Sequence, residues 1–226
     1  TLTATSGVTI SSELYVIVLG AGASTRFGST KQLAKIHGVP MLQLVLSRAQ
    51  ALAGQAVCVV LGANAAQIAP VFAHSPVAVV INRGWEEGLA ASIRAGIEHL
   101  PGHCAGALLL LADQCAVTSA DLQRLADVWR RDRLAIVSAQ YGGGWGVPAI
   151  FPRSSFPALQ ALRGERGAQV LLRHPAGRRV GVPMPSAAID IDTVQELQAL
   201  ATMVPTLDTN GQAADALARQ RKERIA

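Results

Sequence analysis

Short apolar segments alternate with amphipathic helical patterns along this chain up to residue 138. The segments lie at 15–19, 57–61, 77–81, 107–112 and 135–138, and each is apolar on both faces. Such runs are typical of parallel strands buried between two layers of helices. Between the first two of them, apolar residues follow Pro40 at helical spacing, at Leu42, Val45, Leu46 and Ala49. The alternation predicts βαβ units and a doubly wound, mostly parallel α/β sheet.

Two further helices and three later strands complete the prediction. Thr118 is a candidate N-cap for a helix with Leu122, Leu125 and Trp129 on one face, and residues 89–100 predict another helix. After residue 140 the alternation loosens, and we expect strands at 149–151, 180–182 and 189–192, then a helix from Thr193. We therefore expect one domain over 14–204, with an N-terminal extension at 1–13 and a C-terminal tail at 205–226.

Composition excludes several classes of protein. Of the 226 residues, 50% are hydrophobic, which is enough for a sizeable core. The longest uninterrupted apolar runs are about ten residues, half of what a membrane-spanning helix needs. Residues 1–13 have no secretory or transit character, and three cysteines imply no disulfide framework. We therefore expect a cytoplasmic protein with no membrane partner.

The net charge of +5 does not by itself indicate a nucleic-acid partner. The basic residues are spread along the chain, apart from a cluster at 219–224, and only 4% of residues are aromatic. A stacking platform for bases is therefore not expected. A modest positive charge equally suits a small anionic substrate.

The segment LGAGASTRFGSTKQ at 19–32 follows the first predicted strand directly. Gly20 and Gly22 allow close backbone approach, so the amides of residues 20–24 can surround a phosphate group. Arg26 and Lys31 add two cations. Amides followed by two cations are what a nucleoside triphosphate requires, and a plain strand-to-helix turn would not need both charges.

Two other phosphate-binding loops fit this segment poorly. A dinucleotide-binding loop would have a third glycine and an acidic residue about twenty positions later, and here no acidic residue occurs between Glu13 and Glu86. A Walker loop would read G-x-x-x-x-G-K-[ST], which the residues around Gly28 and Lys31 do not match.

Three aspartates are candidate metal or substrate ligands. Asp113 follows the apolar run 107–112, at the edge of an open α/β sheet where ligands bind, and its carboxylate can hold Mg²⁺. The alternative role, an N-cap, suits Thr118 better. Asp190 and Asp192 alternate with isoleucines, so a strand would place both carboxylates on one face. Thr193 and Glu196 form a capping-box pattern, which leaves Asp192 free.

The loop at 19–32 resembles the signature L-A-A-G-x-S-x-R-(M/F)-G-x-x-K-(Q/L) of nucleotidyltransferases of the molybdenum-cofactor type, with Gly20 where that family usually has alanine. Five further blocks, in family order, resemble its cytidylyltransferase branch. They are N-x-x-W-x-x-G-M-x-x-S-(I/L) at 82–93, L-x-D-x-P at 111–115, G-x-x-G-H-P-x-x-(F/L) at 144–151, G-D-x-G-A at 164–168 and D-I-D-T at 190–193. Together the blocks cover roughly residues 14–200.

The resemblance implies a Rossmann-like fold of the nucleotide-diphospho-sugar transferase type and the transfer of CMP from CTP to a molybdopterin-type cofactor, with release of pyrophosphate. It implies Arg26, Lys31 and Asp113 as catalytic residues and Mg²⁺ held by Asp113 and Asp192. The implied nucleotide-binding residues are Leu19, Gly20, Ala21, Gly22, Ser24, Arg26, Lys31, Asn82, Gly88 and Ser92. The implied acceptor-binding residues are Gly146, Pro148 and Asp190.

Some positions depart from the family pattern and leave alternatives open. Val147 stands where the family usually has histidine, and Cys115 stands where it usually has proline. Gln169 stands where an arginine often follows the G-D-x-G-A block. Val147 and Gln169 concern the acceptor side, so a guanylyltransferase, another cytidylyl or sugar-phosphate transferase, or a non-catalytic protein that binds and delivers the cofactor remain alternatives. Cys115 is either a reactive thiol near the site or a small buried side chain. A molybdoenzyme or its chaperone would be the receiving partner.

Overall fold

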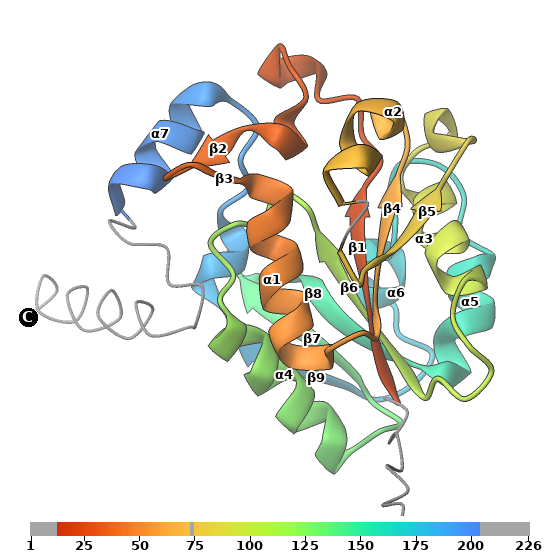
Figure 1. Ribbon diagram of the computed structural model, residues 1–226. Helices are drawn as coiled ribbons and strands as arrows, with labels where there is room; N and C mark the ends of the chain where they lie inside the picture. The colour runs from red at the N-terminus through yellow and green to blue at the C-terminus, as the bar shows by residue number, and fades with distance from the viewer. Residues whose placement is uncertain (1–12, 73–74, 204–226) are drawn as a thin grey trace, which may run out of the picture.

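A seven-stranded sheet flanked by helices forms the body of the molecule in the computed structural model, which describes residues 13–72 and 75–203 (Figure 1). Its strands, in spatial order, are β5 (Ala78–Ile81), β4 (Val57–Leu61), β1 (Leu14–Gly20), β6 (Gly106–Leu111), β8 (Gly144–Pro152), β7 (Ile136–Tyr141) and β9 (Arg179–Pro183). A separate hairpin consists of β2 (Lys35–Ile36) and β3 (Val39–Pro40). The expected extension at 1–13 and tail at 205–226 lie outside the described residues, except for Glu13.

Strand pairing confirms the doubly wound, mostly parallel sheet. β1 pairs in parallel with β4 and β6, β4 pairs in parallel with β5, and β7 with β9, whereas β8 runs antiparallel between β6 and β7. In this register Leu19 lies opposite Leu111, and Gly20 lies opposite Leu61. The carboxyl ends of β1, β4 and β6 therefore coincide, and the loops that leave them meet at the upper edge in Figure 1.

Helices cover both faces of the sheet (Figure 1). The longer helices are α1 (Met41–Ala53), α3 (Leu89–Glu98), α4 (Ser119–Arg131) and α7 (Val194–Met203), and the short ones are α2 (Ala65–Ile68), α5 (Phe156–Gln160) and α6 (Gln169–Arg173). Single 3₁₀ turns lie at η1 (Thr25–Phe27), η2 (Lys31–Leu33), η3 (Ala69–Phe72), η4 (Trp85–Glu87), η5 (Arg153–Ser155) and η6 (Pro185–Ala188). One apolar cluster joins α1 and α4 to one face of the sheet, and a second joins α3, α5 and α6 to the other.

The structure confirms the predicted N-terminal caps of two helices. Thr118 accepts a hydrogen bond from the Asp121 amide at 3.1 Å, and its own amide donates to the Asp121 carboxylate at 2.9 Å, which is a capping box at the start of α4. At α7, Thr193 and Glu196 exchange the equivalent bonds at 2.8 and 3.2 Å. Both helices therefore begin within one residue of the predicted position.

The strand predicted at 189–192 is wrong. This stretch has an irregular backbone between η6 and α7. Ile191 is fully buried, whereas Ile189 is exposed, so the isoleucines do not share a face as the alternation predicted. Of the two isoleucines in the alternating pattern, only Ile191 enters the core, and it does so from a loop. Asp190 and Asp192 consequently lie on a loop, not on a sheet.

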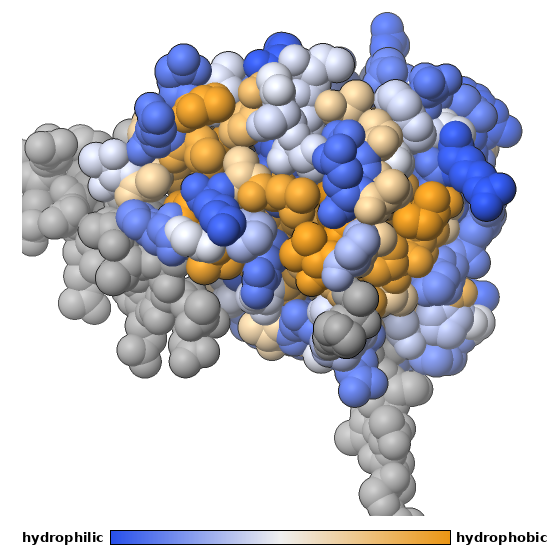
Figure 2. Space-filling view, turned by 45° about the horizontal axis from the view of Figure 1, so that its top comes forward, coloured by the Kyte–Doolittle hydropathy of each residue, from blue (hydrophilic) through white to orange (hydrophobic). Residues whose placement is uncertain are grey.

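Figure 2 shows the molecule with the upper edge of Figure 1 turned forward. Orange apolar side chains gather across the middle of this face, and blue hydrophilic side chains lie around them. The exposed large apolar residues lie in separate parts of the chain, including Val71 in η3, Ile81 in β5 and Leu134 in the turn before β7. Within the described ranges, we find no helix with the length and apolar character that crossing a membrane would require.

Candidate active site

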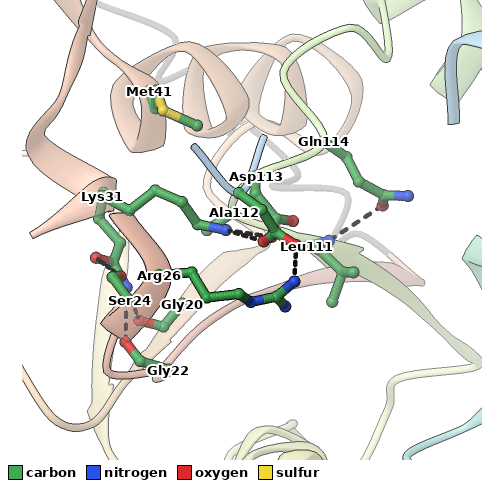
Figure 3. Close-up of polar contacts among 12 residues, drawn as sticks. Gly20, Gly22, Ser24, Arg26, Lys31, Met41, Leu111, Ala112, Asp113 and Gln114 are labelled. Carbon is green, nitrogen blue, oxygen red and sulfur yellow. Dashed lines mark hydrogen bonds and ion pairs between the residues drawn. The ribbon is translucent and has the colours of Figure 1, made fainter. Parts of the chain in front are cut away.

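The loop between β1 and β2 is folded around one buried glutamine. Gln32 is 4% exposed, and its side-chain amide donates to the carbonyl oxygens of Gly20 at 2.9 Å and Gly22 at 3.1 Å. Its own carbonyl oxygen accepts a bond from the Ser24 hydroxyl at 3.2 Å (Figure 3). Ser24 adopts the left-handed backbone conformation, with φ of 57°, which turns the chain back on itself. Gln32 therefore holds the predicted phosphate loop in shape.

This loop offers main-chain donors to an anion. Gly22, Ala23 and Ser24 line a cavity of about 590 Å³, and within the described ranges their amides donate to no protein acceptor. Successive unpaired amides in a turn form a binding site for phosphate oxygens. The loop therefore fits the role predicted for residues 20–24.

The two predicted cations and two predicted carboxylates meet at one point. Lys31 Nζ lies 2.8 Å from Asp113 Oδ2 and 3.1 Å from Asp192 Oδ1. Arg26 extends over the same cluster (Figure 3), and its guanidinium lies 2.9 Å from Asp192 Oδ2. Three separate segments of the chain thus join, although Asp192 is 161 residues from Lys31 in sequence.

Electrostatics keep this lysine charged. Burial lowers the pKa of Lys31, but the charges and hydrogen bonds of Asp113 and Asp192 outweigh burial and raise it above its ordinary value. The Lys31 side chain is only 14% exposed, whereas the Arg26 side chain is 78% exposed. The cluster combines one buried cation and one solvent-exposed cation.

One atom of the cluster fits a divalent metal ion. Asp113 Oδ1 is buried and has no hydrogen-bond partner among the described residues. A buried carboxylate oxygen without a partner is costly unless something binds it. No group of three or more His, Cys, Asp or Glu side chains suited to a metal occurs within 13–72 and 75–203. Two carboxylates with substrate phosphates and water are the ligand set that Mg²⁺ typically uses.

The cavity collects nearly every residue predicted to bind nucleotide or metal, with Asn82 as the exception. The Asn82 side chain is buried behind Ser92, donates to its hydroxyl at 3.1 Å and accepts from the Gly84 amide at 3.0 Å. It therefore orients Ser92 and the turn that precedes α3, and direct contact with nucleotide stays a prediction. Glu165 also lines the cavity and was not predicted, since the G-D-x-G-A block pointed to no contact for it.

The predicted acceptor-binding residues lie outside this cavity. Gly146 and Pro148 are buried within β8, where a side chain at Gly146 would collide with the Tyr141 hydroxyl. Asp190 lies close to the carboxylate cluster, and burial, followed by the charges of Asp113 and Asp192, raises its pKa to about 6. Contact of these three residues with an acceptor stays a prediction.

Cys115 is the small buried side chain, not the reactive thiol. It is 2% exposed, and burial raises its pKa to about 12. A thiol that stays protonated at neutral pH is a poor nucleophile. The chemistry of the site therefore depends on charges and amides.

Known proteins resemble this chain over most of its length. The nicotine blue oxidoreductase of Paenarthrobacter nicotinovorans is 27% identical over 197 residues, which cover 81% of this chain and 94% of that protein. The crystal structure of Rv0371c from Mycobacterium tuberculosis H37Rv superposes with a TM-score of 0.73 and 28% identity, covering 85% of this chain and 99% of that one. A second structure of Rv0371c, with a TM-score of 0.69 over 84% of this chain and 98% of that one, is a complex with manganese.

A more distant structure shares the fold. It is molybdopterin-guanine dinucleotide biosynthesis protein A from Archaeoglobus fulgidus, with a TM-score of 0.64 and 15% identity over 84% of this chain and 97% of that one. The family profile described as MobA-like NTP transferase domain matches residues 16–180, from β1 into β9. This chain belongs to the MobA-like NTP transferase domain family and is a nucleotidyltransferase.

Proposed function

We propose that this nucleotidyltransferase transfers CMP from CTP to the phosphate of a molybdopterin-type cofactor. A phosphate oxygen of the acceptor attacks the α-phosphorus of CTP, the bond between the α-phosphorus and its bridging oxygen breaks, and pyrophosphate leaves with that oxygen. The choice of base and acceptor rests on the ordered sequence blocks at 82–93, 144–151 and 190–193. We expect the product to pass to a molybdoenzyme or its chaperone in the cytoplasm.

The observation that carries this proposal is the junction of Lys31 with Asp113 and Asp192 beside the loop at 20–24. A triphosphate on the loop amides would place its charge against Lys31, and Arg26 could turn from Asp192 onto the leaving pyrophosphate. Asp113 and Asp192 would hold Mg²⁺, which when bound would neutralise charge on the phosphates. No covalent enzyme intermediate is required, because positioning and charge neutralisation account for most catalysis of phosphoryl transfer.

The first experiment measures nucleotide binding by calorimetry, with CTP compared with GTP, ATP and UTP, each with and without Mg²⁺. We expect binding of CTP that is tightest in the presence of Mg²⁺. A preference for GTP would instead indicate a guanylyltransferase with the same chemistry. Binding of no nucleotide would contradict catalysis and favour a protein that only binds and delivers the cofactor.

A second candidate function is an oxidoreductase reaction. It is favoured by the similarity to the nicotine blue oxidoreductase of Paenarthrobacter nicotinovorans, which aligns with 81% of this chain. The two candidates separate in paired assays, the first with CTP, Mg²⁺ and a molybdopterin acceptor. Stoichiometric pyrophosphate supports nucleotidyl transfer, whereas no pyrophosphate together with a loss of nicotine blue absorbance in a parallel assay with an added reductant supports the redox reaction.

A further inference from the structure

Gln114 is a buried side chain next to the metal-type carboxylate, and the roles assigned above leave it unused. It is 1% exposed, and it follows Asp113 in the loop that leaves β6. Its carbonyl oxygen accepts a hydrogen bond from the Leu111 amide at 3.3 Å (Figure 3). This bond closes the turn that carries Asp113, so the side chain of Gln114 is oriented by the end of β6.

The amide group of Gln114 reaches two other segments of the chain. Nε2 donates to the Val147 carbonyl oxygen on β8 at 2.8 Å and to the Ala187 carbonyl oxygen in η6 at 3.2 Å. These partners are 33 and 73 residues away in sequence. The η6 turn continues directly into the loop with Asp190 and Asp192. One side chain therefore joins the turn of Asp113, strand β8 and the segment that brings in Asp192.

Neighbouring contacts make this junction stiff. The Tyr141 hydroxyl donates to the same Val147 carbonyl oxygen at 3.2 Å, so this part of β8 is held from two sides. From α1, Arg48 donates to the carbonyl oxygens of Cys115 and Val117, at 2.5 and 2.8 Å, and fixes the other end of the turn. Fully satisfied buried networks of this kind hold a single arrangement, whereas partly satisfied ones do not.

We propose that Gln114 is a positioning residue that holds Asp113 and Asp192 at the separation a divalent cation requires, by tying both of their segments to β8. The proposal rests on the metal role given to these two aspartates under the proposed function. It does not depend on which base or acceptor the enzyme uses. Loss of a hydrogen bond that orients a metal ligand typically lowers metal affinity by about 10- to 100-fold. Because Gln114 bonds to main-chain groups and to neither carboxylate, we expect the lower end of that range.

The test is the Gln114→Met variant, which keeps the length of the side chain but removes all three hydrogen bonds. Binding of Mn²⁺ is measured by the electron paramagnetic resonance signal of the free ion, with Asp113→Asn as the variant that should not bind. We expect Mn²⁺ affinity to fall about 10-fold or more in Gln114→Met, with the KM for CTP changed much less than kcat. The matched control is Gln123→Met on the exposed face of α4. The Gln123 side chain donates a hydrogen bond to Asp127 on the same helix, and its loss should leave Mn²⁺ affinity unchanged.

The outcomes are distinct. Unchanged Mn²⁺ affinity in Gln114→Met, together with a lower midpoint of thermal unfolding, overturns the proposal and leaves Gln114 as a packing residue. Absence of Mn²⁺ binding in the wild-type protein overturns both this proposal and the metal role of the two aspartates. Should Gln114→Met fail to fold, Gln114→Asn retains the amide on a shorter stem, and wild-type Mn²⁺ affinity in that variant would likewise overturn the proposal. Tighter binding of GTP than of CTP in calorimetry would change the proposed nucleotide and leave the role proposed for Gln114 unaffected.

Discussion

Replacing Lys31 with alanine removes the one cation that both aspartates share. In catalysis, loss of a group that stabilises developing charge typically costs about 10²- to 10³-fold in kcat. For folding, we compare the loss in the free energy of unfolding when one partner of an ion pair is removed. This loss is near zero for an exposed pair and several kcal/mol for a fully buried pair. Since the side chains of Lys31 and Asp113 are 14% and 21% exposed, we expect the free energy of unfolding of Lys31→Ala to fall by about 1–3 kcal/mol.

The sign of the pH dependence follows from the pKa of Lys31. Because the folded pKa is raised above the ordinary value of 10.5, the contribution of the lysine to stability is fully present below that value and is lost only as the solution becomes more alkaline. Measurements at neutral pH therefore report the intact ion pairs. Added Mg²⁺ should recover much of the lost stability by occupying the space between Asp113 and Asp192, but it should not restore turnover.

The assay measures pyrophosphate release with CTP and a molybdopterin acceptor, alongside the midpoint of thermal unfolding with and without Mg²⁺. Lys35→Ala is the matched control, since this lysine lies four residues away and is exposed on β2. Turnover near that of the wild type in Lys31→Ala would refute the role assigned to the lysine. Equal loss in Lys35→Ala would show that general positive charge, and not this geometry, is responsible.

Three further changes test the rest of the site. Gln32→Leu leaves the carbonyl groups of the phosphate loop unpaired, and we expect CTP affinity in calorimetry to fall by about tenfold. Arg26→Met should change the free energy of unfolding by less than about 1 kcal/mol, because the pair is exposed, while the KM for CTP rises. Asp190 has a folded pKa raised to about 6, so ionisation opposes folding as pH rises from 3.8 through 6. Asp190→Asn should therefore raise the midpoint of thermal unfolding more at pH 8 than at pH 5.

Sequence patterns predicted the sheet well because burial on both faces leaves a plain signature. The strand at 57–61 is fully buried and has the predicted bounds, and helix α1 buries its predicted apolar positions. The same kind of reasoning failed at 189–192, where two isoleucines at alternate positions lie in a loop and only Ile191 enters the core. Short elements such as the hairpin of β2 and β3 gave no periodic signal at all.

Residue types predicted the charged part of the site but not the parts that hold it. A lysine after a glycine-rich loop and an aspartate after a strand both indicate chemistry by their place in the chain. Gln32 and Gln114 carry no such signal, since a glutamine is usually an exposed side chain and nothing in the local pattern marks either one as buried. Apart from the Ser24 hydroxyl, their partners are main-chain amide and carbonyl groups, which almost every residue has, so residue types gave little sign of these pairings.

The charged residues of the site and the residues that hold them differ for a physical reason. Reactive groups must be of particular types, and type is visible in a sequence. Their separation depends on hydrogen bonds between distant segments, such as those from Gln114 to Val147 and Ala187. A catalytic site of this kind needs its ligands held to a fraction of an ångström. Under the proposed metal role, the residues that set the separation of Asp113 and Asp192 are therefore the ones that only the folded structure reveals.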